Sequence, residues 1–157
     1  MKFLYAILLT TLLCFTQDDK KDQIQWSATY KLQWTDFMGS PAGSLKAMTW
    51  STIALETKKI DANSITLNMN AFFIKSQSWR QKNFTDDFVL GHEQTHFNIA
   101  EVYTRKLRKK ISQTKYSNTK KAMQEIQKTY NETFAELKAY QKNTMKKPNT
   151  PLIKTSK

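Results

Sequence analysis

A chain of 157 residues is the size of one ordinary domain, and it still buries a modest core if a leader is removed. Aromatic residues make up 12% of it and Gly and Pro are few, which excludes a fibrous protein and favours a packed globular one. The formal net charge is +12 without a nucleic-acid-binding motif, so we expect no specific nucleic-acid binding. We expect the Lys and Arg side chains to form solvated helix faces. The alternative is that they bind an anionic envelope polymer.

The first residues are typical of a secretory signal peptide, which we predict to span residues 1–17. Lys2 precedes an apolar and Thr-containing run from Phe3 to Phe15, and polar residues follow from Gln17. The run is shorter than the roughly 20 residues of a membrane-spanning helix, so we expect no transmembrane span after leader removal. The sequence therefore predicts a secreted or periplasmic protein, with a retained N-terminal anchor as the alternative.

Residues 22–145 are predicted to form one α+β domain that begins with a small antiparallel sheet. The stretch from Ile24 to Phe37 alternates apolar and polar residues, which indicates a half-buried strand. Residues 39–44 have the composition of a loop. Two further strands are expected over residues 47–57 and 64–79, joined by a turn at residues 61–63.

Two long helices are predicted to follow the sheet. The first begins at Thr85 as N-cap and ends at the break in residues 116–118, where Asn118 can cap the second. The second ends before Pro148, and residues 146–157 are predicted to be a flexible tail. Apolar residues recur at helical spacing in both helices. They are Phe88, Val89, Phe97, Ile99, Ala100, Tyr103, Leu107 and Ile111 in the first, and Ala122, Ile126, Tyr130, Thr133 or Phe134, Leu137 and Tyr140 in the second.

The motif His92-Glu93-Gln94-Thr95-His96 lies near the start of the first predicted helix. Residues four apart lie on one helix face, so the imidazoles of His92 and His96 can point at one metal ion. Imidazole nitrogens suit Zn²⁺, and Glu93 lies close enough to act as general base on a zinc-activated water. These are the only two histidines in the chain. The motif therefore predicts a zinc-dependent peptidase that acts on a peptide or protein substrate.

A third protein ligand is harder to assign from the sequence. Glu101 lies about 140° around the helix from His96, so we interpret it as a structural residue. The second helix offers the carboxylates of Glu125, Glu132 and Glu136. We predict Glu132 as the third zinc ligand if the two helices pack antiparallel.

The residues also resemble those of the DUF922 family of bacterial proteins, described as predicted secreted zinc-dependent proteases. The resemblance rests on residues 34–39, on Ser78-Trp79 and above all on residues 91–103, which contain the His-Glu-x-x-His motif. It implies a zincin-like fold, with His92 and His96 as zinc ligands and Glu93 as base.

The chain departs from the family near its C-terminal end, where the family pattern continues with a segment that contains a histidine. Here Asn143-Thr144-Met145-Lys146-Lys147 occupies this region, without a histidine. Three alternatives follow from the residues. Glu132 substitutes as ligand, zinc binds weakly through two ligands, or the protein is a catalytically inactive member that acts as a basic envelope-binding module.

Overall fold

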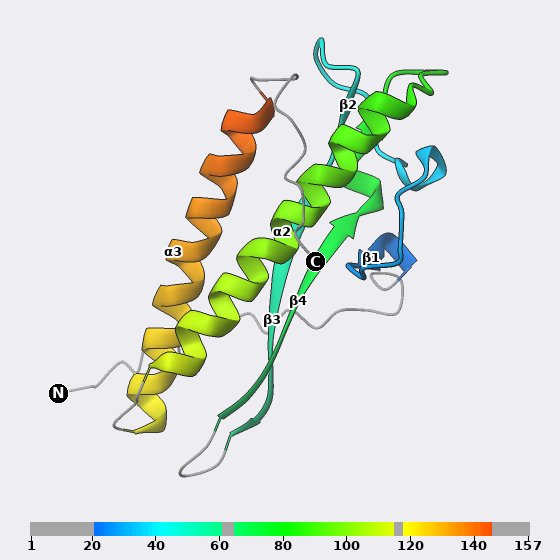
Figure 1. Ribbon diagram of the computed structural model, residues 1–157. Helices are drawn as coiled ribbons and strands as arrows, with labels where there is room; N and C mark the ends of the chain where they lie inside the picture. The colour runs from blue at the N-terminus through cyan, green and yellow to red at the C-terminus, as the bar shows by residue number, and fades with distance from the viewer. Residues whose placement is uncertain (1–20, 61–64, 115–117, 146–157) are drawn as a thin grey trace, which may run out of the picture.

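The computed structural model describes residues 21–60, 65–114 and 118–145. The predicted signal peptide (residues 1–17), the turn at residues 61–63 and the C-terminal tail (residues 146–157) lie outside these residues. Strands come first along the chain and two long helices follow, so the predicted α+β arrangement is confirmed (Figure 1). None of the described helices combines the length and apolar character needed to cross a membrane.

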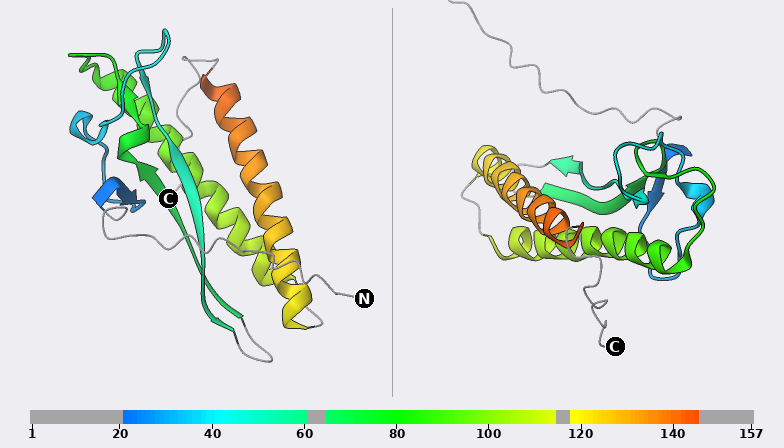
Figure 2. Two further views of the ribbon diagram at one scale, coloured as in Figure 1. Left: turned by 180° about the vertical axis from the view of Figure 1, so that it is seen from behind. Right: turned by 90° about the horizontal axis from the view of Figure 1, so that it is seen from above.

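The larger sheet is antiparallel and has the strand order β1-β4-β3. It consists of β1 (Gln23–Gln25), β3 (Ser51–Ile60) and β4 (Ile65–Ile74). Ile53 pairs with Ala71, and the odd-numbered side chains of β4 from Ile65 to Ala71 contact the core, as their alternation predicts. Both helices cover this one face of the sheet (Figure 2).

A second, two-stranded sheet interrupts both predicted long strands. It pairs β2 (Ala47–Met48) with β5 (Trp79–Arg80), and the short 3-10 helix η2 (Lys75–Gln77) separates β4 from β5. The fully buried Ser78 joins the two sheets, because its hydroxyl accepts from the main-chain N–H of Trp50 at 2.9 Å and donates to the carbonyl of Ile74 at 2.7 Å. A side chain thus replaces a ladder hydrogen bond at the break.

The prediction of one strand from Ile24 to Phe37 is wrong beyond Gln25. Ser27 Oγ accepts from the N–H of Tyr30, and the buried Asp36 carboxylate accepts from the N–H of Gln33 and from the hydroxyl of Tyr30. These local bonds favour a turn and the 3-10 helix η1 (Trp34–Asp36) over a sheet ladder. Leu32 is buried, as the alternation predicts, although the backbone there is not a strand.

Helices α2 (Asp87–Gln113) and α3 (Thr119–Met145) confirm the two predicted helices. The predicted cap Thr85 is wrong by one residue, because the Asp86 carboxylate accepts from the N–H of Val89 at 3.0 Å. Asn118 caps α3 as predicted, accepting from the N–H of Lys121 at 3.0 Å.

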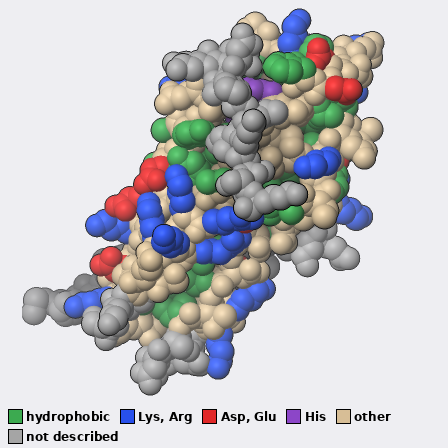
Figure 3. All heavy atoms as spheres, viewed as in Figure 1, with side chains coloured by type: hydrophobic (Ala, Val, Ile, Leu, Met, Phe, Trp, Pro, Cys, Tyr) green, Lys and Arg blue, Asp and Glu red, His purple; other side chains and the backbone are tan. Residues whose placement is uncertain are grey.

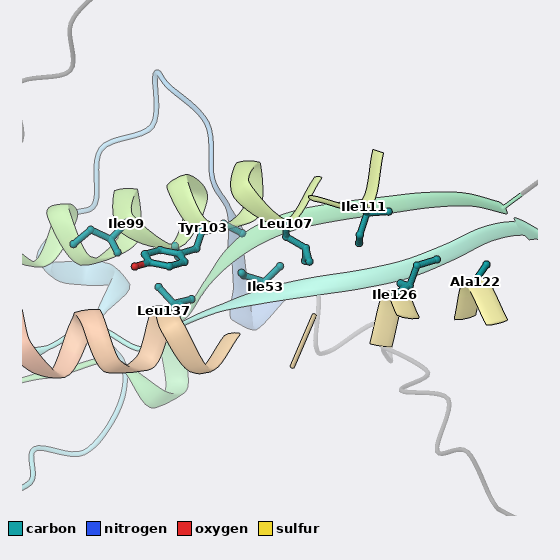
Figure 4. Close-up of a cluster of buried hydrophobic side chains, with 10 residues drawn as sticks. Ile53, Ile99, Tyr103, Leu107, Ile111, Ala122, Ile126 and Leu137 are labelled. Carbon is teal, nitrogen blue, oxygen red and sulfur yellow. The ribbon is translucent and has the colours of Figure 1, made fainter. Parts of the chain in front are cut away.

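The main core lies between the two helices and β3 and β4 (Figure 4). Most of the predicted helix stripes are buried there, and Thr133 rather than Phe134 is the fully buried member of α3. The prediction that Phe88 belongs to the buried stripe is wrong, because its side chain is 71% exposed at the first turn of α2. Buried members of the core include Ile53, Ile99, Ala100, Leu107, Ile111, Ala122, Ile126 and Leu137.

Candidate metal centre

The N-terminal half of α2 brings His92 and His96 together. Their Nε2 atoms are 3.1 Å apart, and the ring centroids are 4.8 Å apart with the planes nearly perpendicular. His96 is 5% exposed and His92 is half-buried. A tetrahedral zinc ion at its usual distance from two imidazoles would separate their nitrogens by about 3.3 Å. The observed separation therefore fits two ligands of one ion.

Burial keeps both imidazoles neutral at pH 7. It lowers the pKa of His92, and burial together with the nearby charge of His92 lowers the pKa of His96 to about 4. A neutral imidazole offers a nitrogen lone pair, which is the form that binds a metal ion.

Glu93 projects from the next position into the protein. It is 4% exposed, and within the described part of the chain its Oε2 atom is buried without a hydrogen-bond partner. Burial raises the pKa of Glu93, although hydrogen bonds from Thr49 oppose the shift. A buried carboxylate oxygen without a partner is costly, and a bound water or metal ion would relieve that cost.

Two residues that the sequence did not single out connect this turn of α2 to the rest of the fold. Thr49, between β2 and β3, donates from Oγ1 to the main-chain carbonyl of Glu93 at 3.3 Å. Gln141 on α3 donates from Nε2 to the carbonyl of His96 at 3.3 Å and to Ser51 Oγ at 3.0 Å. Gln141 lies four residues after the buried Leu137, so continuing the apolar stripe of α3 by one turn would have found it.

Side-chain amides anchor the opposite side of α2 to the N-terminal segment. Gln94 Oε1 accepts from the N–H of Leu32 at 2.7 Å, and its Nε2 donates to Asn98 Oδ1 at 3.0 Å. Asn98 Oδ1 also accepts from Trp26 Nε1 at 3.0 Å. The segment that was predicted as a strand thus fixes the rotation of α2 about its own axis.

The structure does not bring Glu132 to the histidines. Glu132 is exposed on α3. The neighbouring Thr133 accepts a hydrogen bond from Lys110, so this part of α3 packs beside the C-terminal half of α2 and away from His96. Lys110 lies 14 residues beyond His96, which is about 21 Å along α2. Among the described residues, no group of three His, Cys, Asp or Glu side chains is placed to hold a metal ion.

Glu101 forms salt bridges with two arginines, in agreement with its interpretation as a structural residue. Its carboxylate accepts from Arg105 Nε at 2.9 Å and from Arg108 Nη1 at 3.3 Å. Arg108 also donates to the carbonyl of Met69 in β4, so this cluster ties α2 to the sheet.

One family model matches the part of the chain that contains these residues. The family model described as bacterial protein of unknown function (DUF922) matches residues 73–146, which include the end of β4, both helices and the His92, Glu93 and His96 turn. No curated protein and no solved structure gives a match. The zincin-like relationship therefore stays a prediction.

Proposed function

We propose that this member of the DUF922 family is an exported zinc-dependent peptidase, in which His92 and His96 hold the metal ion and Glu93 is the general base. One observation carries the proposal. Two neutral imidazoles with their Nε2 atoms 3.1 Å apart lie next to a buried carboxylate whose Oε2 has no partner within the described structure. This combination suits metal-assisted hydrolysis of a peptide bond.

The residues of the chain would divide the chemistry between them. A zinc ion held by His92 and His96 would supply a water of lowered pKa and a positive charge for the developing oxyanion. Glu93 would accept a proton from the attacking water, whose oxygen bonds to the peptide carbon as the C–N bond breaks. Glu93 then gives the proton to the leaving amine nitrogen. Its raised pKa makes the carboxylate a stronger base and so favours the first of these two proton transfers.

Two protein ligands imply a site that is weaker than a three-ligand zinc site and that is completed by water. The described residues supply the two imidazoles, and Glu132 lies too far along α3 to join them. We therefore propose the two-ligand alternative over the substitution by Glu132.

Metal analysis combined with a peptidase assay tests the proposal. We expect about one zinc per chain in the wild type, loss of zinc in His96→Ala, and loss of cleavage with zinc retained in Glu93→Gln. Glu132→Gln is the matched control and should keep both zinc and activity. A folded wild-type protein that takes up no zinc at a large excess of the metal would refute the peptidase assignment.

The second candidate is a non-catalytic module that binds an anionic envelope polymer. The net charge of +12 and the absence of a third ligand among the described residues favour it. It predicts a metal-free protein whose binding to an anionic polysaccharide weakens as salt is raised, because salt screens the attraction. Retention of that binding by His96→Ala, with no zinc in the wild type, would select this candidate.

A further inference from the structure

The exposed surface of α2 changes character along its length. Between Asp87 and Arg105 the only charged residues are Glu93 and Glu101, and both are buried. The next six residues, 105–110, contain five Lys or Arg. An uncharged surface next to the histidines therefore leads into a strongly basic one.

The uncharged part forms a narrow strip beside the histidine pair. At about 100° per residue, Phe88, Gly91, Thr95 and Val102 fall within about 60° of one another, on the side of His92 opposite to Glu93. The Phe88 side chain is 71% exposed and that of Val102 is 46% exposed. A Cβ atom added to Gly91 would meet nothing within 4 Å, so packing in this fold does not require a glycine there. We call these four residues the uncharged strip.

The basic part continues the same line down the helix. Around the axis, Lys106 lies about 40° and Lys109 about 100° from His92, both toward the side of the uncharged strip, and both are exposed. The Lys106 ammonium group sits 4.2 Å from the centroid of the Tyr103 ring, which holds it in place at the surface. Figure 3 shows Lys and Arg side chains over the middle and lower part of this view, with acidic side chains beside them at its left edge, and histidine near its upper end. We call Lys106 and Lys109, with Arg105, the basic cluster.

We propose that the outer face of α2 is a docking surface for an extended polypeptide, with apolar side chains on the uncharged strip and Asp or Glu side chains on the basic cluster. This inference rests on the proposed function, because it assigns the substrate class of the same site. His92 and Lys106 are 14 residues apart, or about 21 Å along the helix, and an extended chain covers this distance in about six residues. The substrate would therefore carry its carboxylates about six residues from the bond that faces the histidines.

Charge complementarity and position favour a polypeptide over a lipid surface. Carboxylates would gain from the cationic side chains, and the uncharged strip would avoid desolvating a charge near the site. A bilayer would also accept an exposed Phe beside a basic cluster. It would not, however, place a scissile bond at the histidine pair.

Fluorescence anisotropy with the metal-free full-length protein tests the docking surface separately from catalysis. The probe is a labelled peptide of about twelve residues with Val and Phe in one half and Glu in the other. We expect Ser in place of the apolar residues, or Lys in place of Glu, to weaken binding about tenfold. Phe88→Ser and Lys106→Glu should weaken binding of the original peptide by a similar factor. Lys128→Glu, the same charge change at an exposed position on α3, should stay within about twofold of wild type.

Equal binding of the three peptides, or unchanged binding by Phe88→Ser and Lys106→Glu, would overturn the inference. So would vesicles of anionic phospholipid that bind with the same dependence on Phe88 and Lys106 while the peptide fails to compete. The zinc measurement distinguishes the two proposals. Peptide binding without zinc uptake removes the peptidase and leaves the docking surface, whereas zinc uptake and cleavage with unchanged variants remove only the docking surface.

Discussion

Gln141 and His96 are linked although they lie on different helices, because the side-chain amide of Gln141 donates to the main-chain carbonyl of His96. The same amide donates to Ser51 Oγ, so one side chain joins α3, α2 and β3 at the level of the candidate metal centre. The carbonyl of His96 is also part of the α2 backbone, and holding it limits the movement of the turn that presents the imidazoles.

We predict that Gln141→Ala lowers the free energy of unfolding by about 1–2 kcal/mol, because two partly buried hydrogen bonds are lost. Urea denaturation measures the change. Gln127→Ala is the matched control, since Gln127 donates to the exposed Asn131 on the same helix, and it should change stability by less than about 0.5 kcal/mol. Equal effects of the two substitutions would contradict a bridging role for Gln141.

The glycines Gly39 and Gly91 should respond in opposite directions to alanine. A Cβ at Gly39 would lie 2.7 Å from the carbonyl oxygen of Ser76 and 3.0 Å from that of Ser78, both of them backbone atoms. Gly39→Ala should therefore destabilise the protein by about 1–3 kcal/mol. Gly91→Ala should instead stabilise it by about 0.5–1 kcal/mol, because alanine favours a helix interior and the space is open. Thermal unfolding of the pair checks both signs, and a destabilised Gly91→Ala would contradict the second.

Removal of the Glu101 carboxylate should affect stability and spare metal binding. In Glu101→Gln the two arginines lose their anionic partner, but both remain partly exposed, so we expect a cost of only about 1–2 kcal/mol. Glu125→Gln, at an exposed position on α3, should be neutral. Zinc content should match wild type in both variants. A zinc-free but folded Glu101→Gln protein would show that Glu101 takes part in the centre after all.

Tyr130 should make the protein less stable at high pH. Its hydroxyl donates to the carbonyl of Ile53 at 2.8 Å, and burial raises the pKa of Tyr130 above its usual value of 10.0. A raised pKa means that the unfolded chain releases this proton first. The stability contributed by Tyr130 is therefore full below pH 10 and is lost as pH rises through the pKa of the folded state. Tyr130→Phe should cost about 1 kcal/mol near neutral pH.

Denaturation of both proteins across this pH range checks the Tyr130 prediction. The difference in unfolding free energy between wild type and Tyr130→Phe should shrink above pH 10. Lysines and the other tyrosines titrate in both proteins, so their effects cancel in this difference. A constant difference would show that folding does not raise the pKa of this hydroxyl.

Local patterns predicted the helices well, because the 3.6-residue repeat and the caps act within a few residues of sequence. Asn118 was found in this way, and Asp86 was missed only because Thr85 is also a suitable cap. The strand from Ile24 failed because Ser27 and Asp36 offer side-chain oxygens that compete with a sheet ladder. Alternation alone does not reveal that competition.

The candidate centre was predictable only in its local part. His92, Glu93 and His96 lie within one turn and a half of helix, so their relative placement follows from helix geometry. Glu132 and Gln141 depend on how far α3 slides along α2, which is decided by contacts such as those of Lys110 with Thr133 and Glu136. Thr49 depends on the break between β2 and β3, which the fully buried Ser78 sets from another part of the chain. Such long-range contacts leave no short-range signal in the sequence.

The position of the histidines on α2 also determines how seldom this turn can open. His96 is followed by Phe97 at 1% exposure and Ala100 at 0%, whereas Phe88, two turns earlier, is mostly exposed. Backbone amides after His96 should therefore exchange their hydrogens with solvent only when the whole domain unfolds, while those of the first turn exchange through local fraying. The candidate metal centre spans this boundary, with one imidazole on the slowly exchanging body of the helix and the other nearer its fraying end.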